Sequence, residues 1–202
     1  MHQLFPSEID PACSKWRHGP GTGAQQPVSG STIQLYTVGT TGSDSTATPL
    51  LTQPATTDAK GNFDITGRFS CTQATQVYLT AIGGTPANAS SNPDLTLMTA
   101  LGPCSSLTQG TYITVNEVTT VAGVAALALY MTAAGSIGSN PADTKQLADA
   151  FTLASQFVNP ATGFTPGSGV PFDMTVPSYI INTVGNILAT CVDSAGGVAG
   201  DL

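Results

Sequence analysis

The chain has 202 residues, of which 41% are hydrophobic, so it is long and apolar enough to form one large domain or two small ones with a buried core. Only 8% of the residues are charged, against about 25% in an average soluble protein, which indicates a neutral, hydroxyl-rich surface. Five scattered basic residues and a net charge of -7 oppose binding to nucleic acid or to anionic membranes.

The first 24 residues form an N-terminal arm, in which prolines and glycines prevent any long regular element. The arm carries Leu4, Phe5, Ile9 and Trp16, apolar side chains that are unfavourable to leave in water. We therefore expect it to dock in a groove, either on its own domain or on a neighbouring subunit. The opening sequence has no apolar export segment, which predicts that this is a mature form or an unusual start.

Residues 25–115 have the pattern of a β domain. The segments STIQLYTV (31–38), FDITGRF (63–69) and QVYLTAI (76–82) alternate apolar and polar residues, and LTLMTALG (95–102) and TYITV (111–115) are further candidate strands. Turn residues separate them at short intervals, except in residues 39–57, which are expected to form a long loop with one short strand. This spacing predicts an antiparallel β-sandwich.

Residues 116–202 form a helical region that we expect to pack on the sandwich, which makes the chain an α+β protein. Thr114 and Glu117 predict a capping box at the start of its first helix. The strictly apolar part of that helix, residues 121–131, is too short for the roughly 20 residues of a membrane span, so a buried core helix is favoured.

Two further amphipathic helices are predicted. The first covers residues 141–158 and places Leu147, Ala150, Phe151, Ala154 and Phe157 on one face. The second covers residues 176–192, with Ser178 as its N-cap, and its apolar stripe consists of Ile180, Ile181, Val184, Ile187, Leu188 and Cys191.

The four cysteines, Cys13, Cys71, Cys104 and Cys191, lie far apart and form no CxxC pair, which gives no support to a zinc knuckle or a thioredoxin-like motif. Their even number favours two disulfides over free thiols, and therefore an oxidising, extracellular location. A nucleophilic Cys13 activated by His18 is the less favoured alternative.

The sequence predicts no catalytic residue, metal site or cofactor, and hence no enzyme. Both histidines, His2 and His18, lie in the arm, whereas a Ser-His-Asp site needs a histidine within the fold. Glu117 is assigned to capping, with a buried and partnered acid as the alternative. A calcium loop that begins at Asp58 would place Lys60 where a ligand oxygen is required, so a turn closed by a left-handed glycine is favoured.

Three segments, QQPVSGSTIQLY, TTDAKGNFDITG and VYLTAIGG, resemble the carboxypeptidase regulatory-like domains, which are transthyretin-like β-sandwiches. Less than a third of the chain carries this resemblance, through Pro27, Val28, Gly30, Ile33, Leu35, Thr57, Asp58, Gly61, Phe63 and Ile65. It implies an Ig-like sandwich and a non-catalytic extracellular module, and the whole layout is similar to secreted bacterial proteins. In the resemblance Cys71 and Cys104 bracket one strand, which implies that they pair and leaves Cys13 to Cys191, within one chain or between two.

Two functions follow as expectations. The first is an extracellular structural protein that self-assembles through its arm, such as a subunit of a bacterial surface filament. The second is a monomeric secreted adhesion or carbohydrate-binding module that binds glycan or cell wall through loops 39–57 and 83–94. Asn88 lies in an Asn-Ala-Ser sequon, and whether it is glycosylated stays open.

Overall fold

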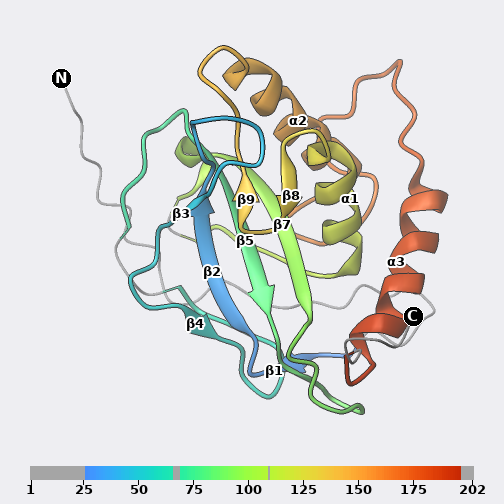
Figure 1. The fold of residues 1–202 in the computed structure, drawn as a ribbon. Coiled ribbons are helices and arrows are strands. Elements are labelled where there is room, and N and C mark those ends of the chain that lie inside the picture. The colour runs from blue at the N-terminus through green and yellow to red at the C-terminus, as the bar shows by residue number, and fades with distance from the viewer. Residues whose placement is uncertain (1–25, 66–68, 109, 197–202) are drawn as a thin grey trace.

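The computed structural model describes residues 26–65, 69–108 and 110–196 (Figure 1). The strands are β1 (Val28–Ser29), β2 (Thr32–Thr37), β3 (Thr48–Pro49), β4 (Ala55–Thr56), β5 (Gln76–Ile82), β6 (Thr85–Pro86), β7 (Thr96–Pro103), β8 (Met131–Ala133) and β9 (Ser136–Ile137). The helices are α1 (Glu117–Leu127), α2 (Thr144–Phe157) and α3 (Ser178–Val192), and η1 (Cys104–Ser106) is a 3-10 turn.

The centre of the fold is a five-stranded antiparallel sheet with the order β3-β2-β5-β7, in which β4 also pairs with β2. Ile33 lies opposite Ala81 and Leu35 lies opposite Leu79, so the apolar residues of β2 and β5 share one face. This is the result expected from their period of two. The predicted strands at 31–38, 76–82 and 95–102 are confirmed.

The two faces of this sheet are covered differently. Helices α1 and α2 pack on one face, over Tyr78, Met98 and Ala100 (Figure 1). Irregular chain covers the other face, where the side chains of Phe63 and Ile113, among others, join those of β2 and β5 in one core cluster. The protein is therefore α+β, with both faces of its main sheet buried.

Two segments, 63–69 and 111–115, were expected as strands; residues 63–65 and 111–115 are not strands in the structure, and residues 66–68 lie outside the described residues. Burial alternates in the first segment, where Phe63 and Ile65 are buried around the exposed Asp64, but in the second Thr114 is buried together with Ile113 and Val115. The backbone N–H of Thr114 donates to the Pro160 carbonyl at 2.7 Å, and not to a neighbouring strand. An alternating sequence does not show whether a neighbouring strand is present, so the two-sheet sandwich stays a prediction.

Helix α1 begins at a cap different from the one predicted. Its N-cap is Asn116, whose side-chain oxygen accepts from the Thr119 amide at 2.8 Å, while the Thr119 hydroxyl accepts from the Asn116 amide at 2.9 Å. The Thr114 hydroxyl donates instead to the Ala161 carbonyl at 2.9 Å. The predicted Thr114–Glu117 capping box is wrong because a tertiary bond takes Thr114, and Asn116, itself a strong cap, replaces it.

The first turn of α1 also covers the edge of the sheet. The Thr120 hydroxyl accepts from the Met98 amide at 3.0 Å, and the Thr119 hydroxyl lies 2.9 Å from the Met98 carbonyl, which can accept its proton. Met98 belongs to β7, the last strand in the sheet order. Backbone groups on an exposed edge can pair with another chain, and at Met98 two helix hydroxyls occupy them.

Helices α2 and α3 match their predicted positions closely. Of the five residues predicted on one face of α2, four are buried and Phe157 is partly buried; the four are Leu147, Ala150, Phe151 and Ala154. Helix α3 packs on α1 and lies at the outside of the molecule (Figure 1). Its N-cap is Pro177 and not Ser178, which is the first helical residue. Within the described residues, no helix combines the length and apolarity that crossing a bilayer requires.

Candidate functional site

The structure places only some of the predicted site residues. It joins Cys71 to Cys104 in a disulfide with 6.1 Å between the Cα atoms, the pair that the resemblance implied. Cys191 is exposed and has a free thiol. The arm residues, namely Leu4, Phe5, Ile9, Cys13 and Trp16, lie outside the described residues, as do both histidines.

A shallow hollow of about 380 Å³ opens beside the disulfide, where the β2–β3 loop meets the segment before β5. Hydroxyl groups dominate its lining, which consists of Thr37, Val38, Gly39, Thr40, Thr41, Thr46, Thr48, Leu50, Ser70, Cys71, Thr72 and Thr75. No lining residue is charged or aromatic. Such a surface can donate and accept hydrogen bonds with a neutral polar ligand.

The loop that forms one wall of this hollow is held in place by the β8–β9 hairpin. The Asp44 amide donates to the Tyr130 carbonyl at 3.0 Å, and the Ala47 amide donates to the Gly135 carbonyl at 3.2 Å. Gly39 and Gly138 form a parallel bridge, and a Cβ on Gly39 would overlap Ser45. The close approach therefore requires glycine, and it gives the hydroxyl-lined hollow a fixed wall.

The second feature is an exposed apolar stripe on α3, formed by Ile180, Val184, Ile187 and Cys191. Ile180 is 62% exposed, Val184 42% and Ile187 63%. These positions repeat at helical spacing on one face. The face that packs inward is a different one, where Ile181, Gly185 and Val192 are buried. Only Ile181 and Leu188 of the six predicted stripe residues contact the core, so the α3 stripe is left in solvent.

The C-terminal end of α3 is held by a residue distant in sequence. The buried Asn92 side chain donates to the Cys191 carbonyl at 3.0 Å, and its oxygen accepts from the Asp94 amide at 3.2 Å. The last carbonyls of a helix lack partners within the helix, so Asn92 supplies one. This bond fixes α3, and with it the α3 stripe, against the loop that follows β6.

Glu117 is the only strongly buried acid in the described chain. It is 4% exposed, and burial raises the pKa of its carboxyl group, with a smaller contribution from the negative charge of Asp193. The alternative expectation, that the Glu117 side chain is buried, is therefore confirmed. Among the described residues no three His, Cys, Asp or Glu side chains come together as metal ligands would.

The Asp58 turn is closed by a left-handed glycine, as predicted, although no strand follows it at residues 63–65. The Asp58 carboxylate accepts from the Lys60 amide at 2.7 Å and from the Asn62 amide at 2.9 Å, and Gly61 has a φ of 71°. The hydrogen bond from the Asn62 backbone is the main cause of the lowered pKa of Asp58. Both carboxylate oxygens accept hydrogen bonds within the turn, the second from the Asn62 side chain. The turn is therefore structural.

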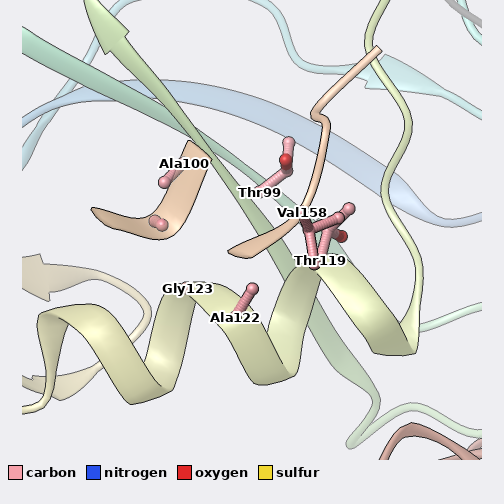
Figure 2. Close-up of a pocket in the computed structure, with 7 residues that line it drawn as sticks. Thr99, Ala100, Thr119, Ala122, Gly123 and Val158 are labelled. Carbon is pink, nitrogen blue, oxygen red and sulfur yellow. The ribbon is translucent and has the colours of Figure 1, made fainter. Parts of the chain in front are cut away.

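A small internal gap lies between α1, α2 and β7. Its volume is about 10 Å³, and its lining consists of Thr99, Ala100, Thr119, Ala122, Gly123, Ala154 and Val158 (Figure 2). One water molecule needs at least about this space together with two or more polar partners. The gap is a packing defect where small residues meet, and it is too small for an organic ligand.

Comparisons with protein-family models, with curated proteins and with solved structures give no match. The functional argument therefore rests on the residues of this chain, and the resemblance to carboxypeptidase regulatory-like domains stays a prediction.

Sequence reasoning anticipated these surface features only in part: the expected binding loop 39–57 lines the hollow, whereas the expected loop 83–94 does not. The hydroxyl-lined hollow joins residues 37–50 to residues 70–75, and the only available signal was the density of threonine in both segments. The α3 stripe was recognised as apolar, without an expectation of which of its residues would be exposed.

Proposed function

We propose that this protein is an extracellular structural protein that assembles with itself, as a subunit of a bacterial surface filament, through its N-terminal arm. The observation that supports this most directly is the α3 stripe. Large apolar residues gathered on one face of a fold mark contact surfaces. Tyr179, which is 84% exposed, lies beside the stripe and adds an aromatic residue of the kind enriched at interfaces.

The arm and the α3 stripe are complementary in chemistry. The arm carries Leu4, Phe5, Ile9 and Trp16 within its first 16 residues, and the stripe offers three aliphatic side chains and a thiol. Burying the two surfaces against each other would remove apolar area from water on both sides. Exchange of such an arm between identical subunits is a route to assembly that needs no new surface.

The remaining properties support a secreted module. The Cys71–Cys104 disulfide is the state of cysteine pairs in oxidising compartments. The low density of charged residues limits electrostatic repulsion between neighbouring copies. Among the described residues, one ion pair is found, between Lys145 and Asp149. The transthyretin-like sandwich and the three-region layout of 1–24, 25–115 and 116–202 belong to the same proposal.

Electron microscopy and light scattering of the purified chain test this proposal. We expect filaments or oligomers that are lost in Ile180→Asp, which places a charge on the α3 stripe. Asn182→Asp, an exposed position on another face of the same helix, is the matched control and should assemble normally. A monodisperse monomer at high concentration in which Trp16 is buried would refute self-assembly.

A secreted carbohydrate-binding or adhesion module is the second candidate, and the hydroxyl-lined hollow supports it. Threonine hydroxyls match the hydrogen bonding of sugar hydroxyls, although sugar sites usually add an aromatic residue and this lining has none. Glycan-array binding that is lost in Thr40→Val/Thr41→Val and kept in the exposed control Thr175→Val would favour this module. No binding by the parent chain would exclude it for the glycans on the array.

A further inference from the structure

We propose that, before assembly, the arm of each chain covers the α3 stripe of the same chain and is locked there by a disulfide between Cys13 and Cys191. This inference rests on the proposed role of the α3 stripe as the assembly surface, and it names the regulation of that surface. It is carried by the position of the first described residues, the length of the arm, and the free thiol of Cys191.

The described chain begins close to the end of α3 that carries Cys191. In β1, Val28 pairs with Pro86 and lies against Gly84, whose carbonyl accepts from the Asn92 amide at 2.8 Å. The Asn92 side chain then donates to the Cys191 carbonyl at 3.0 Å. A short series of direct contacts therefore connects the start of the described chain to the cysteine.

The arm is long enough to reach this cysteine. Residues 14–25 separate Cys13 from the described chain and span at most about 40 Å when extended. The distance that they must cover is short, because the contacts through Gly84 and Asn92 are all direct. Cys13 can therefore approach Cys191 of its own chain without strain.

The rest of the arm is long enough to cover the stripe. From Cys191 back to Ile180 the stripe is about 17 Å long, at 1.5 Å of rise per helical residue. Residues 4–13 are about 30 Å long when extended, so a chain leaving Cys13 can cover the whole stripe. Ile9, about 13 Å from Cys13 in an extended chain, would then lie near Val184, and Phe5 would reach past Ile180.

Closure within one chain is favoured over exchange in dilute protein. A tether of this length holds the arm at a local concentration in the millimolar range, which exceeds the concentration of other copies in a dilute solution. The same contacts become available to a neighbouring chain when copies are crowded, because exchange reuses identical surfaces. The arm docked on its own α3 stripe and locked by the Cys13–Cys191 disulfide, here called the clasp, would therefore keep newly exported chains apart.

The chemistry of the clasp is thiol–disulfide exchange. The two thiols lose two protons and two electrons as the Sγ–Sγ bond forms, and the electrons reduce a small-molecule disulfide, such as oxidised glutathione, to two thiols. Cys71 and Cys104 already form a disulfide with each other, so Cys13 is the one cysteine left in the chain to pair with Cys191.

The test uses the full chain, reduced and then reoxidised with a glutathione pair at low protein concentration. Monomer isolated by size exclusion is digested without reduction and analysed by mass spectrometry for a linked peptide that contains Cys13 and Cys191. Refolding a mixture of ¹⁴N and ¹⁵N chains, digested without prior fractionation so that linked dimers are kept, separates the two origins. Closure within a chain gives linked peptides of one isotope only, whereas a statistical share of mixed pairs, or two free thiols in the monomer, would overturn the proposal.

A charge on the stripe tests the docking step. Ile187→Asp should lower the rate of clasp formation about tenfold, because it removes roughly one buried aliphatic side chain from the closed form. Asn186→Asp, the adjacent exposed residue on another face, should leave the rate unchanged, and circular dichroism checks that both variants are folded. Equal rates in both variants would show that the stripe does not receive the arm.

Failure of this inference is distinguishable from failure of the proposed function. Assemblies seen by electron microscopy in a Cys13→Ser variant, with no clasp in the parent monomer, would leave self-assembly standing and remove the clasp. A clasp in the monomer without assembly at any concentration would leave the clasp standing and remove the proposed self-assembly.

Discussion

Breaking the Cys71–Cys104 disulfide should lower the free energy of unfolding by about 3.7 kcal/mol. The bond joins residues 33 apart in sequence, and the chain-entropy relation gives about 12.5 cal/mol/K for a loop of that length, or about 3.7 kcal/mol at 25 °C. The cross-link limits the unfolded chain more than the folded one. Its loss should therefore also raise the denaturant m-value, because the reduced unfolded chain is more expanded.

The measurement compares oxidised and reduced protein in a Cys13→Ser/Cys191→Ser background, so that only one bond changes. Urea unfolding followed by far-UV circular dichroism gives the two free energies. Cys71→Ala/Cys104→Ala is the control for incomplete reduction and should match the reduced protein to within its packing loss. A decrease below about 1 kcal/mol with an unchanged m-value would refute the loop-entropy reasoning.

Three further substitutions test individual contacts. Glu117→Gln should raise stability at pH 7 and flatten the pH dependence of stability. The pKa of Glu117 is higher in the folded chain than in the unfolded chain, so the parent gains stability as the pH falls through the folded pKa toward about 4.3. A pH series of thermal unfolding should show no such gain in the variant. Tyr78→Phe should be neutral or stabilising by about 1 kcal/mol, because the Tyr78 hydroxyl is buried without a hydrogen-bond partner among the described residues; a clear loss in urea unfolding would show that this hydroxyl is satisfied. Thr120→Val should cost about 1–3 kcal/mol, since it leaves the buried Met98 amide without its acceptor, whereas Thr152→Val on the exposed side of α2 should cost little in the same assay.

The local elements were readable from the sequence because short-range physics sets them. Alternation in STIQLYT and QVYLTAI is sufficient to place β2 and β5, since a strand with one face in a core repeats every two residues. Helix α2 follows from its 3.6-residue apolar period in the same way. The Asp58 turn is equally local, because its hydrogen bonds all close within five residues.

The errors in the sequence reading came from contacts between distant segments. Thr114 was assigned to a capping box, but its hydroxyl bonds to Ala161, 47 residues away. Residues 111–115 alternate like a strand, yet the amide of Thr114 pairs with Pro160. The periodicity of apolar residues does not show which partner a backbone group bonds, so these hydrogen bonds could be identified only from the tertiary structure.

The sequence by itself determined the α+β class, the neutral surface, the main strands and helices, and the segments that alternate into the core. Only the tertiary structure decided that α3 packs on α1 through Ile181 and Gly185 and leaves Ile180, Val184 and Ile187 in solvent. The same holds for the hydroxyl-lined hollow, whose two walls come from segments about 30 residues apart. The physical reason is that apolar spacing determines which residues can be buried together, whereas the number and size of the neighbouring elements determine which of them are.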